Sequence, residues 1–304
     1  METLLDTIVN GFLTAIQGGT MAVAPYGVAL LGAMALLAYW FRFAPEVASA
    51  GVGLGDALAA FLFLVIGLGI TQWIVLNLIP MGDALYQSAI QIGLSAAGSN
   101  ISSEQLRNPS FILSMHKVVT RPLEDFILNQ TGWAQLWNSS TIWGYWSAEM
   151  VIYVVFVGIA LNMAMIVLEF YFSILAAAVL LPCVVFFPSA ALGEFAVGWV
   201  LGGTVRLFLV TAVAGIAVPL FETLAAPSQG IATDPRWVEV IGLVAAALLF
   251  GIIAWVVPSR AANLVGQGLG ISASTVMGAA ASSTRGVIML QSAIRGTSNL
   301  LQRG

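Results

Sequence analysis

The 304-residue chain has few charged residues: 8% are Asp, Glu, Lys or Arg, whereas 60% are hydrophobic. Soluble domains carry roughly 25% charged residues, so this shortage excludes an ordinary soluble domain and indicates a polytopic membrane protein. The mean hydropathy of +0.97 agrees with this class. A net charge of -4 without clustered Lys and Arg argues against a nucleic-acid-binding surface.

Cysteine and histidine are almost absent. The single cysteine, Cys183, lies in an apolar run and is interpreted as a packing residue that cannot form an intramolecular disulfide. The single histidine, His116, is best explained as an ordinary surface or interface residue. Neither residue belongs to a nucleophile-and-base arrangement, and metal-ligand spacings of Cys and His do not occur. We therefore predict no catalytic residue, no metal and no cofactor.

Basic residues are missing from the first 41 positions. The start, METLLDTIVNGF, lacks the positive region of a secretory signal peptide, so we expect it to remain in the mature protein. Its apolar residues recur at helical spacing and predict an interfacial helix that ends at Gly18 and Gly19.

Long apolar runs dominate the rest of the chain, and a spanning helix needs about 20 such residues. We expect five spans, at residues 23–41, 57–79, 148–170, 196–221 and 237–257. The second should end at Pro80 and the last at Pro258, because proline lacks the backbone donor that continues a helix. The run 172–192 contains Pro182 and Pro188, which predict a re-entrant or broken helix there.

The distribution of basic residues predicts an orientation. From Pro258 onward the tail carries Arg260 and three further arginines with no acidic residue. Because basic residues near span ends stay in the cytoplasm, we expect the N-terminus outside, the C-terminus inside and five crossings. The segment 81–147 then lies outside, although it carries three basic residues. A six-span arrangement with both ends cytoplasmic remains the alternative.

The central segment is expected to be mostly helical. Asn108 before Pro109 and Arg121 before Pro122 predict two helix starts with proline in the first turn, each followed by an amphipathic pattern. We divide the chain into four parts: an interfacial helix with two spans (1–80), an extramembrane helical segment (81–147), a C-terminal transmembrane bundle (148–257) and a cytoplasmic Gly/Ser/Ala-rich basic tail (258–304).

Five large aromatic residues precede the third expected span: Trp133, Trp137, Trp143, Tyr145 and Trp146. An interfacial aromatic belt explains the rings nearest the span. Trp and Tyr also dominate protein interfaces, because they bury a large area at little entropic cost. Trp133 and Trp137, together with Trp143, are therefore candidates for contacts with a partner.

Arg206 lies near the middle of its expected span, where a charge costs at least about 2.5 kcal/mol. It must therefore face protein, water or a carboxylate. One helix face, expected to point inward, carries four further candidates: Gly158, Asn162, Met165 and Glu169. We predict that Glu169 or Glu194 pairs with Arg206. The alternative is that Arg206 extends to a nearer interface while Glu194 lies in a cytoplasmic turn.

Glycines suggest close helix contacts. The sequence GQGLG at 266–270 is not a phosphate loop, because the following Lys and the strand-to-helix setting are missing. Gly266 and Gly270 fit either tight helix packing or a flexible exit from the membrane. Gly202 and Gly203 lie on a small-residue face suited to helix contacts between subunits.

Two stretches carry a family resemblance: EFYFSILAAAVLLPCVVFFPSAALGEFAVGWVLGGTVRLFLVTAVAGIAVPLF and VVPSRAANLVGQGLG. They resemble the TrbL family of polytopic inner-membrane subunits of bacterial type IV secretion and conjugation machines. The likeness covers about residues 150–270 best and the N-terminal half mainly by layout. The Pro-Ser-Arg-Ala-Ala sequence after the last span is its most telling part. The tail is shorter than in many relatives.

The resemblance implies a non-enzymatic subunit of a homo-oligomeric ring, five-fold in this family, in the bacterial inner membrane. Its implied partners are a minor pilin or stalk protein, the major pilin, other inner-membrane components and lipids. It implies support of a stalk or pilus and transfer of DNA or protein. Separate ATPases would supply energy, since the sequence has no P-loop. The alternative function is a small-solute transporter or channel, although such proteins often show internal repeats with paired broken helices, and no repeat is visible here.

Overall fold

The computed structural model describes residues 2–48, 54–98, 101–129, 139–225 and 237–268, and within these ranges it contains helices and no strand. The expected all-helical fold class is confirmed. The α-helices are α1 Glu2–Ala48, α2 Leu54–Leu76, α3 Leu78–Ala97, α4 Ser103–Arg107, α5 Pro109–Asn129, α7 Ser139–Leu180, α8 Ala190–Ala225 and α9 Trp237–Gly268. Two short 3-10 helices, η1 Leu181–Val185 and η2 Phe187–Ser189, connect α7 to α8.

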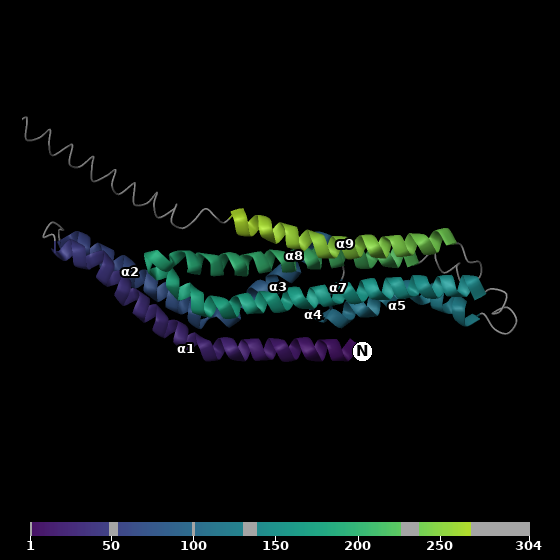
Figure 1. The fold of residues 1–304 in the computed structure, drawn as a ribbon, viewed down its shortest axis with the longest axis horizontal. Helices are drawn as coiled ribbons and strands as arrows, with labels where there is room; N and C mark the ends of the chain where they lie inside the picture. Colours follow the sequence, from purple (N-terminus) through teal and green to yellow (C-terminus); the bar gives the residue numbers. More distant parts are fainter. Residues whose placement is uncertain (1, 49–53, 99–100, 130–138, 226–236, 269–304) are drawn as a thin grey trace, which may run out of the picture.

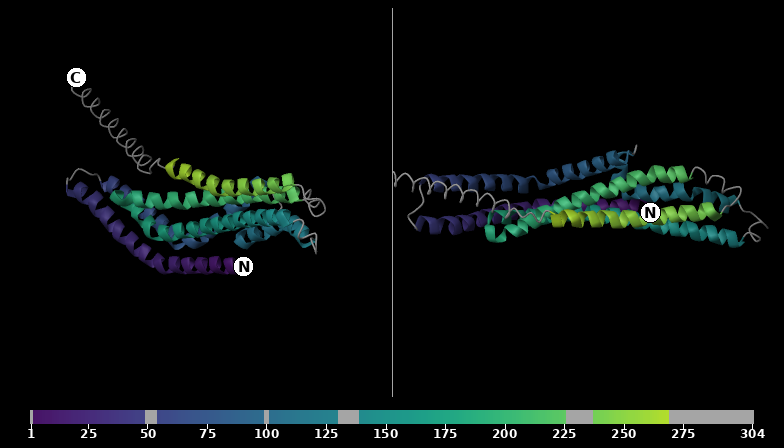
Figure 2. Two further views of the ribbon diagram at one scale, coloured as in Figure 1. Left: turned by 45° about the vertical axis from the view of Figure 1, so that its right-hand side comes forward. Right: turned by 90° about the horizontal axis from the view of Figure 1, so that it is seen from above.

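The helices form an elongated bundle built around α7 and α8 (Figure 1). These two helices lie antiparallel along the long axis, and α9 packs against both. Helix α1 packs on α7, on the side away from α9 (Figure 1). In the view from above, α2 and α3 lie on one side of the bundle, and α7 and α9 lie on the other (Figure 2). The core is centred on buried side chains of α7 and α8, including Phe156, Met163, Phe170 and Leu207.

Among the described residues, four helices are long and apolar enough to cross a membrane: Leu5–Phe41, Ser140–Val185, Ala190–Phe221 and Trp237–Ala261. The pair Leu64–Leu76 and Leu78–Ala97 makes a fifth candidate if it counts as one span bent by 69°. The protein is therefore a polytopic helical membrane protein with four or five candidate spans among its described residues, and the five expected spans require the bent pair to count as one.

The N-terminal helix does not end at Gly18 and Gly19 as expected. Helix α1 continues through both and is 47 residues long. A glycine inside a helix costs about 1 kcal/mol relative to alanine, which packing can offset. Val9, Ile16 and Leu31 are all buried along α1, so tertiary contacts on both sides of the glycines hold the helix together.

The second span breaks at Asn77 rather than at Pro80. Helix α2 ends at Leu76, and Pro80 lies in the first turn of α3. The nitrogen of Pro80 cannot donate to the carbonyl of Leu76, but a first-turn residue needs no such bond. The chain therefore bends before the proline and starts a new helix that includes it.

The break expected within 172–192 is confirmed, and it occurs at the two prolines. Helix α7 runs without interruption to Leu180, so residues 172–180 extend the preceding span. Pro182 and Pro188 lie in η1 and η2, where they end the regular helix. At 1.5 Å per residue the 42 residues of α7 measure about 63 Å, longer than the ~30 Å hydrocarbon layer. Part of α7 therefore extends beyond that layer.

Two prolines that were expected to begin or end helices lie inside them instead. Helix α5 is continuous through Pro122, and α9 passes Pro258 and reaches Gly268. The expected domain boundaries at 80/81 and 147/148 likewise fall inside α3 and α7. The central segment therefore shares helices with the spans on either side of it.

Candidate functional site

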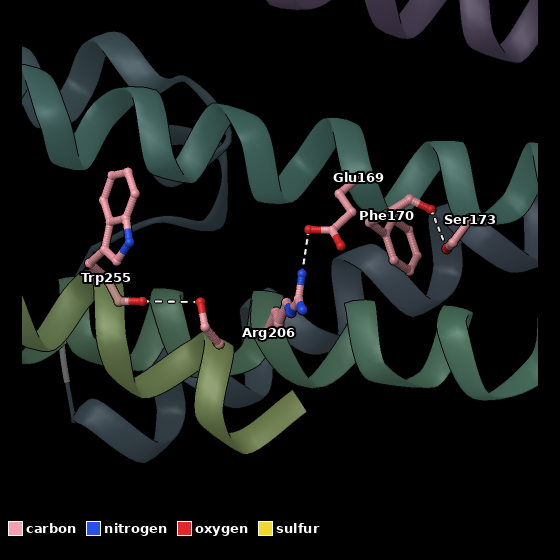
Figure 3. Close-up of polar contacts among 6 residues, drawn as sticks. Glu169, Phe170, Ser173, Arg206 and Trp255 are labelled. Carbon is pink, nitrogen blue, oxygen red and sulfur yellow. Dashed lines mark hydrogen bonds and ion pairs between the residues drawn. The ribbon is translucent and has the colours of Figure 1, made fainter. Parts of the chain in front are cut away.

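An ion pair joins α7 and α8 within two of the candidate spans. Nη1 of Arg206 donates to Oε2 of Glu169, and Figure 3 shows the two side chains pointing toward each other. Arg206 is the 17th residue of the 32-residue candidate span Ala190–Phe221, so the pair lies near mid-span. The carboxylate therefore lies where an isolated charge would cost most.

The pair is not fully enclosed by the chain. The side chain of Glu169 is 40% exposed and that of Arg206 is 23% exposed. Nε of Arg206 is buried and has no hydrogen-bond partner in the described part of the chain. One carboxylate thus neutralises the charge but leaves part of the hydrogen-bonding capacity of both groups unused.

Close packing one turn earlier positions this pair. Gly202 and Gly203 are buried, and a Cβ on Gly203 would lie 3.2 Å from Cδ2 of Phe170. Phe170 directly follows Glu169, so the small glycine lets α8 approach α7 at the level of the ion pair. Gly203 therefore packs against α7 within the chain, while the expectation that the two glycines contact another subunit stays a prediction. Small-residue faces serve helix contacts within one chain and between subunits, and the sequence pattern alone does not distinguish the two.

Glu194, the other predicted partner of Arg206, lies near the start of α8 and makes no ion pair with a described residue. It is twelve residues before Arg206 on the same continuous helix, which corresponds to about 18 Å of rise. That separation prevents direct contact between the two side chains.

An open apolar groove surrounds the Glu169 carboxylate. It has a volume of about 770 Å³ and is lined by Val23 of α1, Trp199 of α8 and the α7 residues Met165, Leu168, Glu169, Phe172, Leu175, Ala176 and Val179. Glu169 is the only charged residue among them. We call this surface the Glu169 groove.

The α7 face that carries Gly158, Asn162, Met165 and Glu169 was expected to point inward, and this is wrong for the single chain. Met165 is 65% exposed, and a Cβ on Gly158 would meet nothing within 4 Å. Gly158 and Asn162 line a second groove, of about 350 Å³, between α7 and α9. The face thus lines two grooves on the outside of the bundle.

Asn162 explains why α9 continues through Pro258. Pro258 has no N–H to donate to the carbonyl of Ala254, four residues earlier. Nδ2 of Asn162 donates to that carbonyl at 3.1 Å. A side chain of α7 thus replaces the missing helical hydrogen bond of α9, as membrane helices with internal proline require.

Two further polar contacts were not predicted from the sequence. The hydroxyl of Tyr171 on α7 donates to Oδ1 of Asp83 on α3 at 2.6 Å. Asp6 of α1 accepts from the backbone N–H of Ser110 at 3.1 Å and from its hydroxyl at 2.5 Å. The partners of each pair are 88 and 104 residues apart, so no local pattern reveals them.

The remaining predicted contact residues are only partly described. Trp143 is 75% exposed near the start of α7. Trp133, Trp137 and Gly270 lie outside the described residues, and Gly266 lies within α9, near its end. Among the described residues no group of three or more His, Cys, Asp or Glu could hold a metal ion.

A comparison with known protein families gives a match. The family model described as TrbL/VirB6 plasmid conjugal transfer protein matches residues 36–257. No curated protein and no solved structure matches the chain.

Proposed function

The chain belongs to the TrbL/VirB6 plasmid conjugal transfer family, and from this we propose that it is a non-enzymatic subunit of a homo-oligomeric ring in a bacterial inner membrane. It is a membrane component of a conjugal transfer, or type IV secretion, system. In our proposal the ring supports the assembly of a stalk or pilus and the transfer of DNA or protein, with energy supplied by separate ATPases. Its partners are stalk and pilin proteins and other inner-membrane subunits.

The observation that carries the ring is the partly exposed ion pair of Glu169 and Arg206. In a single chain surrounded by lipid, a carboxylate exposed by 40% near mid-span would face hydrocarbon. Polar groups at that depth almost always face the interior of a bundle or a water-filled cavity. A neighbouring copy would cover the Glu169 groove and remove this cost.

The proposed orientation puts the C-terminus in the cytoplasm and the N-terminus in the periplasm. One end of the bundle gathers the C-terminal ends of α1 and α9, the start of α2 and η1 (Figure 1). Arg42 and Arg260 belong to the helix ends gathered there, and basic residues at span ends favour the cytoplasmic side. Five crossings, with α2 and α3 as one bent span, agree with this orientation.

The test combines genetics with a size measurement. We expect deletion of the gene to abolish conjugation or secretion and the intact gene, supplied separately, to restore it. Protein purified in mild detergent should have the native size of a closed oligomer. A monomeric size, or normal transfer without the gene, would exclude the proposal. For the orientation, we expect activity from a periplasm-dependent reporter fused to the N-terminus and from a cytoplasm-dependent reporter fused to the C-terminus.

A further inference from the structure

The outer face of α3 carries uncharged polar side chains on a helix that is otherwise suited to the membrane. Its inner face is buried through Gly82, Tyr86, Ala89, Ile90, Gly93 and Leu94. The opposite face exposes Gln87, Ser88, Gln91 and Ser95, which follow one another at helical spacing. We call these four residues the α3 polar face.

This face needs a polar partner or water. Helix α3 forms part of the bent candidate span, and amide groups in hydrocarbon are costly when they make no hydrogen bond. In membranes, Ser and Gln side chains commonly bond across helix interfaces. The two glutamines supply N–H donors, which a carboxylate accepts in strong charge-assisted hydrogen bonds.

The α3 polar face and the Glu169 groove lie at the same depth. Tyr86 contacts Phe170 with ring centroids 6.3 Å apart, and a Cβ on Gly82 would touch Ile174. Helices α3 and α7 are therefore antiparallel, with Tyr86 level with Phe170. Gln91 is five residues beyond Tyr86, and Met165 is five residues before Phe170, so both lie about 7.5 Å from that level in the same direction.

The two surfaces lie on opposite sides of the chain. Tyr171 donates to Asp83 and so marks the side of α7 that faces α3. Glu169 precedes Tyr171 by two residues, which corresponds to about 200° around a helix, and it lines the groove on the other side. Figure 2 agrees, since α2 and α3 form one side of the bundle seen from above and α7 and α9 the other.

We propose that the α3 polar face of one copy binds in the Glu169 groove of the next copy, so that Gln87 and Gln91 donate to the Glu169 carboxylate. The proposal rests on the ring proposed above and specifies its contact. Different surfaces meet in it, so the contact is head-to-tail, which is the kind that closes into a ring. In a ring, neighbouring copies are related by a rotation about the membrane normal, which keeps each residue at the same depth in the membrane. The two surfaces can therefore meet only if they lie at the same depth, and they do. Ser88 and the neighbouring Ala84 are small enough for close helix approach.

The test uses disulfide crosslinking in membranes. Cys183 is the only cysteine, so Cys183→Ala provides a cysteine-free background. In it, Gln91→Cys and Met165→Cys combined in one chain should form a ladder of crosslinked dimers and larger oligomers under mild oxidation. Each single variant should form none, and a mixture of the two single variants should stop at dimers. Gln91→Cys combined with Met150→Cys is the matched control, because Met150 is similarly exposed on α7 but fifteen residues from Met165.

A second measurement leaves Cys183 unchanged. Gln87→Leu and Gln91→Leu together should weaken association about tenfold at each contact, which native size against protein concentration would measure. An unchanged oligomer would overturn the inference, because a face that merely meets lipid should tolerate leucine.

The outcomes separate this inference from the proposed function. An intact oligomer without the Gln91–Met165 ladder overturns the contact but leaves the ring. Rapid reaction of Gln91→Cys in the assembled oligomer with a membrane-impermeant maleimide also overturns it, because the α3 polar face would then line a water-filled pore. A monomeric native size overturns the ring itself and the contact with it.

Discussion

Nδ2 of Asn162 donates a hydrogen bond of 3.1 Å to the carbonyl of Ala254, which Pro258 leaves without its helical donor. Helix α9 thus carries an internal proline that a side chain of α7 compensates. The hydrogen bond makes α9 beyond Ala254 depend on a residue 92 positions earlier.

The first prediction concerns this bond. Asn162→Leu should lower the free energy of unfolding in detergent by about 1–2 kcal/mol, because the buried carbonyl of Ala254 loses its partner. Pro258→Ala restores an N–H to α9, so Asn162→Leu should cost much less in that background. Denaturation midpoints of the two single variants and the double variant test this. Equal costs of Asn162→Leu in both backgrounds would contradict it.

The ion pair gives the second prediction. Arg206→Glu and Glu169→Arg should each lower the amount of assembled protein, at a cost of about 2 kcal/mol for placing like charges together near mid-span. The double exchange should recover much of the loss. Native gels of membrane extracts measure the assembled fraction. Glu194→Arg is the control, since Glu194 makes no ion pair with a described residue and should change assembly little. A double variant no better than the single ones would rule out the pairing as the cause.

Composition and energetic cost predict most of the fold. The apolar runs predict the polytopic helical class, because helices are one of the few structures that satisfy every backbone polar group in a membrane. Arg206 near mid-span predicts a carboxylate partner, Glu169 or Glu194, and the structure pairs it with Glu169. These predictions depend on single residues or on short stretches of sequence, and they need no knowledge of contacts between distant residues.

The features that the sequence does not predict depend on distant partners. Pro258 ends a helix unless a donor such as Asn162 replaces its N–H, and the sequence does not reveal that donor. Gly203 fits close contact with any helix, and only the structure identifies Phe170 as its neighbour. Met165 and Glu169 share one face of α7 as expected, but the sequence does not show whether that face points into the bundle or away from it.

The third prediction compares a crowded glycine on α3 with an uncrowded glycine on α9. A Cβ on Gly93 of α3 would lie 2.0 Å from Oγ1 of Thr211 and 2.7 Å from the carbonyl oxygen of Phe208 on α8. Gly93→Ala should therefore push α3 from α8 and destabilise the protein by about 1–3 kcal/mol. Gly242→Ala on α9, where a Cβ meets nothing within 4 Å, should be neutral or stabilising by up to about 1 kcal/mol. Thermal melts of both variants in one detergent test the contrast, and equal melting temperatures would refute it.

The last prediction concerns Asp6, which joins α1 to the N-terminus of α5. The first four N–H groups of a helix lack intrahelical acceptors, and Ser110 is the second residue of α5. Its N–H and hydroxyl both donate to the Asp6 carboxylate, whose charge also interacts favourably with the helix dipole. Loss of a helix cap typically costs about 1 kcal/mol, so Asp6→Ala should speed amide exchange in the first turn of α5 roughly fivefold. Ser110→Ala should have a smaller effect, because it keeps the backbone bond. Asn10→Ala, one turn further along α1, should leave exchange in α5 unchanged. Equal exchange in the Asp6→Ala and Asn10→Ala proteins, followed by mass spectrometry, would show that α5 does not depend on this cap.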